Sequence, residues 1–124
     1  MKVLLSIKPQ FAEKIFDGTK LFEFRRTIFK ENVKTVLVYA SSPTQMVIGE
    51  FEIEEIISDT LDNLWRRTRI HAGIEEDYFY EYFGDKEHGF AIKIKKTRKY
   101  RKPLCIKEDL NLVPPQSFVY LNGY

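Results

Sequence analysis

GTKLFEFRR, residues 18–26, is the stretch at which the hydrophobic period of this chain changes from helical to alternating. Just upstream, Phe11, Ile15 and Phe16 recur at helical spacing, and Asp17-Gly18 is a typical helix stop. Within the stretch, alternation places Phe22 and Phe24 on one face of a predicted strand and places Leu21, Glu23 and Arg25 on the other. The sequence therefore predicts a short helix followed by a strand with charges on one face.

The remainder of the chain consists of short apolar segments separated by loop signals. The run at Lys2–Ile7 predicts a strand, and Pro9 suits the first turn of the helix that follows. Gly49 lies inside a clearly alternating segment and indicates a bulge or a close backbone approach. Periodicity predicts further strands at 33–40, 46–57, 90–100, in a shorter apolar piece beyond Pro103, and within 113–121. It also predicts inserted helices at 61–72 and 75–83, and a helical turn near 107–110.

This order of elements predicts an α+β fold, a mixed β-barrel of five to six strands with flanking and inserted short helices. The chain of 124 residues has no internal repeat, low-complexity tract or linker, so we expect a single domain over residues 1–124. Lys8-Pro9 interrupts the first apolar run, and no later run reaches about 18 residues. We therefore expect a cytoplasmic protein without a membrane segment.

The charge balance of the chain indicates how it could bind a nucleic acid partner. Lys and Arg total 20 against 18 Asp and Glu, so the net charge of +2 is far from that of a protein that coats nucleic acid. The basic residues nevertheless crowd between Lys93 and Lys102. This cluster is either a solvated strand end or a source of phosphate contacts. Nucleic acid, if bound, should be recognised by a local pocket or patch.

The familiar catalytic and metal-binding patterns are absent. The sequence contains no nucleophile elbow, P-loop, dinucleotide fingerprint or H-E-x-x-H motif. His71 and His88 read as surface or capping residues, and Cys105 in its apolar run reads as an inert buried thiol. We accordingly expect no metal site and no cofactor.

The charged side chains of residues 18–26 are the strongest candidates for chemistry. Lys20 lies at the entry to the predicted strand, and Glu23 and Arg25 share one face of it. On an open surface these groups would form an ion-pair ladder of little energetic value. Facing a pocket, the cations would attract a phosphate, carboxylate or polarised carbonyl, and Glu23 would orient them or accept a proton.

The motifs around this stretch resemble those of the ASCH domains, a branch of the PUA-like superfamily. The resemblance rests on SIKP (residues 6–9), a short helix, the pattern G-x-K-x-x-E-x-R at residues 18–25, VYASSP (38–43) and VIGEF (47–51). It continues into FAIK (90–93) and PPQSF (114–118), and so spans nearly the whole chain. It implies a pseudo-barrel with a cleft against its helices that recognises RNA or a nucleoside-like small molecule.

The resemblance also implies the residues of the site. The motif itself supplies Gly18, Lys20, Glu23 and Arg25, to which we add Arg26, the next residue of the stretch. Neighbouring strand ends should add the binding residues Lys8, Ser41, Ser42, Gln116 and Ser117, together with Phe118, whose ring could stack on a base.

A hydrolase is the alternative that the resemblance leaves open. Some compact ASCH proteins look like amidohydrolases of acylated cytidines that use a lysine, a threonine and a glutamate, and ribonuclease activity is suggested for other relatives. Here Lys20 matches the lysine, but Glu23 stands where the threonine is expected, and Glu75 and Glu76 are the nearest choices for the acid. As an enzyme, the chain would use Lys20 and Glu23, with Lys20 an electrophile, a base or a nucleophile.

Three functions therefore remain open from the sequence. The first is a binding module for RNA or a modified nucleoside, and the second is a small hydrolase of acylated nucleosides or RNA. The third is a protein-interaction domain that uses the arginine-bearing face of the predicted helix at 61–72. The oligomeric state and the ligand are not predicted by any feature of the chain.

Overall fold

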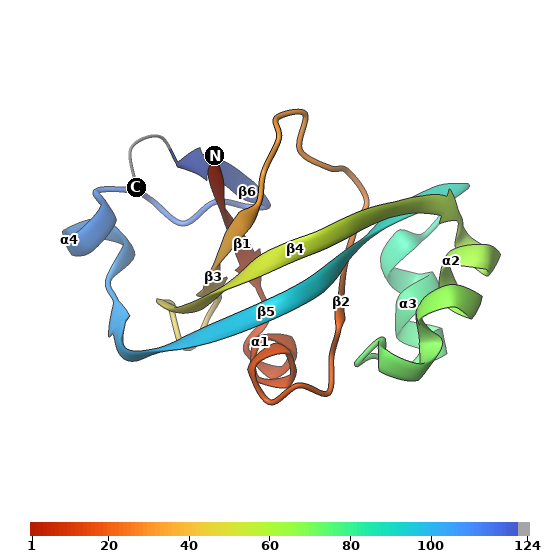
Figure 1. The fold of residues 1–124 in the computed structure, drawn as a ribbon, viewed down its shortest axis with the longest axis horizontal. Helices are drawn as coiled ribbons and strands as arrows, with labels where there is room; N and C mark the ends of the chain where they lie inside the picture. Colours follow the sequence, from red (N-terminus) through yellow and green to blue (C-terminus); the bar gives the residue numbers. More distant parts are fainter. Residues whose placement is uncertain (122–124) are drawn as a thin grey trace.

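The computed structural model describes residues 1–121 and has an α+β fold built on one six-stranded mixed sheet. The strands follow the order β2-β5-β4-β3-β1-β6 across the sheet (Figure 1). Their bounds are β1 Lys2–Ile7, β2 Phe22–Arg25, β3 Thr35–Ala40, β4 Met46–Thr60, β5 His88–Leu104 and β6 Phe118–Leu121. The helices are α1 Pro9–Phe16, α2 Leu61–Thr68, the 3₁₀ helix η1 Arg69–His71, α3 Glu76–Phe83 and α4 Ile106–Leu110.

Strand β1 lies between β3, to which it runs parallel, and the edge strand β6, to which it runs antiparallel. Its residues are buried on both faces. Val3, Leu5 and Ile7 pack in the core cluster that contains Ala12 and Ile15 of α1, whereas Leu4 packs in the cluster that contains α4. Burial on both faces explains why the first strand reads as a continuous apolar run rather than as an alternating one.

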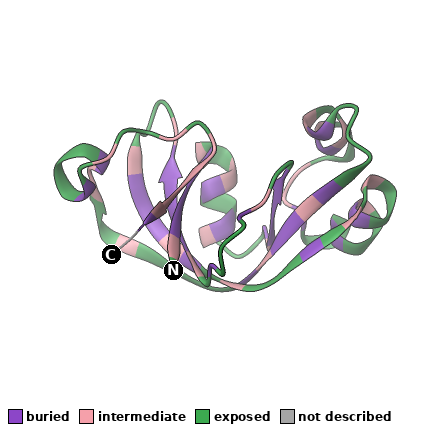
Figure 2. Cartoon of the chain, turned by 90° about the horizontal axis from the view of Figure 1, so that it is seen from above, coloured by how far each residue is buried: buried purple, intermediate pink, exposed green. Residues whose placement is uncertain are grey.

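A long antiparallel hairpin of β4 and β5 carries the inserted helices at its far end. The hairpin pairs Thr60 with His88, and the chain between these two residues forms α2, η1 and α3 (Figure 1). Thr60 is the N-cap of α2 and accepts a hydrogen bond from the backbone N–H of Asn63 at 3.4 Å, as expected for its residue type. These helices enclose a second apolar cluster with Phe22 and Phe24 of β2, separate from the main core (Figure 2).

The bulge predicted at Gly49 is present. The register of β4 shifts between Val47 and Gly49, on both the β3 and the β5 side. A Cβ atom at Gly49 would lie 2.5 Å from Cζ of Phe16. The glycine therefore lets α1 approach the sheet closely.

The sheet is not closed into a barrel, which corrects one part of the predicted fold. The α+β class, the number of strands and the inserted short helices are confirmed. However, β2 and β6 each pair with only one neighbour and form the two edges. Each edge strand has only four residues, and no backbone pairing joins β2 to β6 within residues 1–121. Among the described residues, no helix is long and apolar enough to span a membrane.

Candidate functional site

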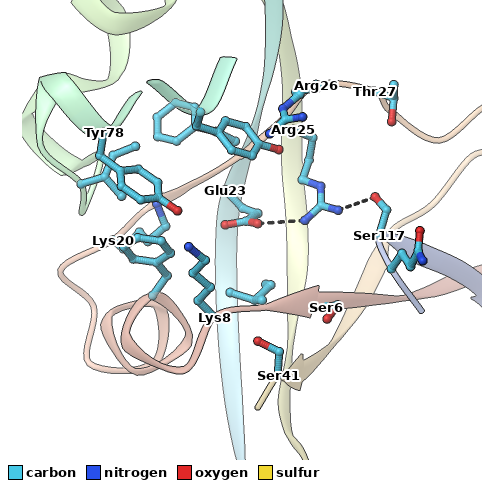
Figure 3. Close-up of a pocket in the computed structure, with 16 residues that line it drawn as sticks. Ser6, Lys8, Lys20, Glu23, Arg25, Arg26, Thr27, Ser41, Tyr78 and Ser117 are labelled. Carbon is cyan, nitrogen blue, oxygen red and sulfur yellow. Dashed lines mark hydrogen bonds and ion pairs between the residues drawn. The ribbon is translucent and has the colours of Figure 1, made fainter. Parts of the chain in front are cut away.

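A cavity of about 510 Å³ lies where the two edges of the open sheet face each other. Its walls come from the end of β1, the start of α1, strand β2, one side of α3 and the segment just before β6 (Figure 3). The volume falls within the range of about 300–1,000 Å³ that is usual for small-ligand sites. The lining contains four cations and one acid, which are Lys8, Lys20, Arg25, Arg26 and Glu23.

Lys20 is the most deeply buried of these cations, with 1% of its surface exposed. The backbone reaches this position through Gly18, whose φ of +86° ends α1, and the Lys20 N–H then donates to the Lys14 carbonyl. Its Nζ donates to the Ala72 carbonyl at 2.7 Å and lies 5.0 Å from the ring centre of Phe24. Burial lowers the pKa of the Lys20 amine from 10.5 to about 8, although the Glu23 carboxylate opposes this shift.

The space for Lys20 depends on Gly73. This residue has a φ of +71°, a conformation that glycine adopts readily, and a Cβ atom there would lie 2.5 Å from both Cβ and Cγ of Lys20. A second lysine, Lys14, donates to the Gly73 carbonyl at 3.1 Å. Two lysines thus hold consecutive carbonyls of the segment that joins η1 to α3.

Glu23 and Arg25 form a buried ion pair on the cavity face of β2. Nη1 of Arg25 lies 3.2 Å from Oε2 of Glu23, and Nη2 of the same guanidinium donates to the hydroxyl of Ser117 (Figure 3). Ser117 is positioned in turn by its carbonyl, which accepts from the Ser6 N–H of β1 at 3.0 Å. Side chains thus connect the two edges of the sheet where backbone pairing does not.

Two exposed cations stand over tyrosines of α3 at the rim of the cavity. Nζ of Lys8 lies 5.3 Å from the ring centre of Tyr78, and Cζ of Arg26 lies 4.6 Å from that of Tyr82. Both distances are within the range of cation–π contacts. Burial also raises the pKa of the Tyr82 hydroxyl. The α3 wall therefore presents two aromatic rings one helical turn apart.

Comparisons with known proteins show the family of the chain. The model of the ASCH domain family matches residues 5–103. The chain belongs to the ASCH domain family. It is 30% identical over 125 residues to an ASCH domain-containing ribonuclease from Zymomonas mobilis, covering 97% of this chain and 84% of that protein.

Solved structures of an ASCH protein from Zymomonas mobilis have the same fold. The crystal structure of the unsubstituted ASCH protein superposes with a TM-score of 0.90 at 31% identity, and the match covers 98% of this chain and 88% of that one. A tyrosine-to-phenylalanine variant of the same Zymomonas mobilis protein gives the same TM-score at 30% identity, and the match covers 98% of this chain and 91% of that one. The resemblance to ASCH domains inferred from the motifs is thereby confirmed, as is the PUA-like α+β architecture.

Other relatives are much longer proteins of Ureaplasma parvum. An ATP synthase subunit alpha is 33% identical over 120 residues, which are 96% of this chain but only 15% of that protein. A large ribosomal subunit protein uL22 is 32% identical over 120 residues, again 96% of this chain and 39% of that protein. An ASCH-like segment of this length therefore also occurs within longer chains.

Most of the residues predicted from the ASCH resemblance lie around the cavity. The lining includes Lys8, Lys20, Glu23, Arg25, Arg26, Ser41, Gln116 and Ser117. Gly18, Ser42 and Phe118 lie outside it. Gly18 ends α1 on the surface, and Ser42 is exposed in the turn after β3.

Phe118 packs against the main core and does not line the cavity. Its ring packs edge-on against Phe29 at 5.2 Å and against Tyr120 at 5.5 Å. Although Phe118 directly follows a lining residue, the alternation of β6 turns it to the other side. It is therefore not placed to stack on a ligand base.

The aromatic wall of α3 was not found from the sequence. Tyr78 and Tyr82 are more than fifty residues from the motif, within the helix predicted at 75–83. In the structure Phe79 and Phe83 are buried, while the half-buried tyrosines line the cavity. The signal available was chemical, because tyrosine has a polar end that tends to remain near water.

The basic cluster of β5 does not contribute to the cavity. None of its residues from Lys93 to Lys102 is among the lining residues. Lys93, Arg98 and Lys99 form ion pairs with Glu54, Glu50 and Glu13. At least these three cations are neutralised locally by acids on the neighbouring elements.

The carboxylates that the amidohydrolase alternative needs are also outside the cavity. Glu75 and Glu76 are exposed at the start of α3, and neither lines the site. The threonine that does line it, Thr27, follows the motif instead of standing within it. Among residues 1–121 no group of three or more His, Cys, Asp or Glu side chains is arranged to hold a metal ion.

Proposed function

We propose that this ASCH chain binds RNA and that one nucleotide of the RNA enters the cavity. The observation that carries the proposal is the composition of the walls, in which the buried cations Lys20 and Arg25 face an α3 wall bearing Tyr78 and Tyr82. A nucleotide combines the two chemistries that such walls bind, an anionic phosphate and a flat aromatic base.

The ion pair between Glu23 and Arg25 supports the proposal that one side of the cavity binds a phosphate. Glu23 holds the Arg25 guanidinium in a fixed orientation and Ser117 holds its other end, so that little side-chain entropy remains to be lost on binding. Arginine in such a fixed position suits the planar, bidentate recognition of phosphate oxygens. The tyrosine rings support the base side, since stacking on an aromatic ring contributes about 1–3 kcal/mol per base.

Binding is tested with a fluorescein-labelled single-stranded RNA of mixed sequence, by fluorescence anisotropy. The wild-type chain should bind, and Tyr78→Ala should weaken binding at least about fivefold because a stacking surface is lost. Lys86→Ala, an exposed cation outside the lining, serves as the control and should change nothing. Equal affinity of wild type and folded Tyr78→Ala would contradict the use of this cavity.

Ribonuclease activity is a second candidate, favoured by the name of the Zymomonas mobilis relative and by the pKa of Lys20, about 8. A general base works best with a pKa near the operating pH. In this reaction the neutral Lys20 amine accepts the 2′-hydroxyl proton, and the 2′-oxygen attacks the adjacent phosphorus. The bond to the 5′-oxygen of the next nucleotide then breaks, and that oxygen takes a proton from water. Arg25 stabilises the charge on the phosphorane.

Cleavage is tested on the same RNA by gel electrophoresis, with a 2′-O-methyl copy as the control. Cleavage should leave a 2′,3′-cyclic phosphate and a 5′-hydroxyl end, and the 2′-O-methyl RNA should stay intact. Lys20→Met should abolish cleavage. Binding without any cleavage by the wild type would leave the binding function and exclude the enzymatic one.

A further inference from the structure

The cations at the rim of the cavity are exposed, unlike those on its floor. Lys20 and Arg25 are buried, whereas Lys8 and Arg26 are the two exposed cations of the lining. They come from separate elements, since Lys8 is the N-cap residue of α1 and Arg26 directly follows β2. Figure 3 shows them on either side of Glu23.

The α3 wall connects these two cations in space. Lys8 lies over Tyr78 and Arg26 lies over Tyr82, four residues further along the same helix. Four residues of α-helix rise by about 6 Å. The two cation–tyrosine pairs are thus arranged one turn apart along the mouth, on the scale of the repeat of an extended nucleic acid strand.

We propose that the cavity takes an internal nucleotide of a single strand, whose base enters while the phosphates on its two sides rest on Lys8 and Arg26. The inference rests on the proposed RNA binding and narrows it to a substrate class. The preferred ligand is a strand with at least one nucleotide on each side of the bound one, rather than a free nucleoside, a mononucleotide or a strand end.

The arrangement of charges supports a strand that crosses the mouth. A single terminal phosphate would need one cationic group beside the base, and the buried Arg25 already supplies one on the floor. Two further cations at the rim, on either side of Glu23, match two phosphates. Neither Lys8 nor Arg26 is in an ion pair with an acid within residues 1–121, in contrast to Arg25.

Competition binding against the labelled RNA tests this class. The homotrinucleotides ApApA, CpCpC, GpGpG and UpUpU are ranked first, and the tightest is then compared with its dinucleoside monophosphate and its nucleoside. Affinity should rise from the nucleoside to the dinucleoside monophosphate, and again from the dinucleoside monophosphate to the trinucleotide. Lys8→Gln and Arg26→Gln should each weaken binding of the trinucleotide about two- to fivefold, as expected for exposed charge pairs, and weaken binding of the nucleoside, which has no phosphate, by less.

Salt dependence provides the readout that a structural role would not change. For single strands, log K falls with log salt by about 0.7 per phosphate contact, so each rim variant should reduce this slope by about 0.7. Arg66→Gln and Lys86→Gln replace exposed cations outside the lining and are the matched controls. Lys8 makes no side-chain cap to α1, so its replacement should leave the helix intact.

The outcomes separate this inference from the proposed function. If Tyr78→Ala weakens RNA binding while both rim variants retain the wild-type slope, the cavity binds RNA but the strand does not cross the rim. A nucleoside that binds as tightly as the trinucleotide would likewise overturn the inference. If the wild type binds none of the probes, the proposed function and the inference both fail.

Discussion

Lys20 has the least ordinary environment of any residue in this site. Its amine is enclosed by two phenylalanine rings and the Ala72 carbonyl, at 5.0 and 5.4 Å from the centres of the Phe24 and Phe11 rings and 2.7 Å from the oxygen. The Glu23 carboxylate favours its charged form, but burial has the larger effect on the pKa. A lysine of this kind is more reactive near neutral pH than a solvated one, because a larger share of it is unprotonated.

The stability of the protein should therefore rise with pH above about 8. Between pH 8 and 10.5 the unfolded chain keeps a proton on Lys20 that the folded chain has lost, so unfolding takes up a proton and becomes less favourable. The gain over this pH range is on the order of a few kcal/mol. Urea unfolding from pH 7 to 10 should show this rise in the wild type and in Lys86→Met. The same rise in Lys20→Met would show that another group is responsible.

Gly73 should be hard to replace, and Gly84 provides the comparison. Both have a positive φ, +71° and +61°, but a Cβ at Gly84 has no atom within 4 Å while one at Gly73 meets Lys20 at 2.5 Å. Gly84→Ala should cost about 1–3 kcal/mol for backbone strain alone, and Gly73→Ala about 2–3 kcal/mol more as Lys20 is displaced. Chemical denaturation measures both values. If both variants lost the same free energy of unfolding, the Lys20 side chain would be able to move away from a Cβ at position 73 without destabilising the fold.

At the scale of elements, α3 serves the core and the cavity with different residues of one short helix. Phe79 and Phe83 are fully buried, and Phe79 packs 5.1 Å from Phe24 and 4.9 Å from Phe83. Tyr78 instead contacts Phe11 of α1 and Lys8 at the rim. The helix needs its buried side to persist, because eight residues are too few for a stable helix alone.

Substitutions on the two sides of α3 should therefore affect different properties, stability on the buried side and RNA affinity on the cavity side. Phe79→Ala should lower the free energy of unfolding by about 3–5 kcal/mol, since a large ring is removed from a filled core. Tyr78→Ala should lower it by only about 1 kcal/mol and instead reduce RNA affinity. Thermal unfolding and anisotropy together measure both effects. A Tyr78→Ala protein as unstable as Phe79→Ala would assign Tyr78 to the core.

At the scale of the whole molecule, the site is located by the failure of the sheet to close. The edge strands β2 and β6 leave a gap, and the cavity occupies it with Arg25 and Ser117 bridging the two sides. The net charge of +2 provides no broad electrostatic attraction, and the acids of β4 and α1 neutralise part of the basic β5 strand. Recognition must then come from the few cations of the cavity.

Local patterns were sufficient to place most elements and the charged motif. The period change at residues 18–26 located α1 and β2, and the Gly49 bulge followed from one small residue in an alternating strand. Neighbouring residues were harder to separate. Ser41 and Ser117 line the cavity, whereas Ser42 and Phe118 do not. Neighbouring residues of a strand point to opposite faces of the sheet, and the register between strands is set by their pairing rather than by their composition.

The sequence by itself determined the ASCH family, the α+β class and the identity of Lys20, Glu23 and Arg25 as the charged group of the site. These depend on local periodicity and on motifs within a few residues. Only the tertiary structure decided that the sheet stays open, that α3 supplies Tyr78 and Tyr82, and that Lys20 is buried against Ala72. The physical reason is that burial and pKa depend on which distant segments pack together, here α1, β2 and the segment from η1 to α3, and that packing is a property of the whole chain.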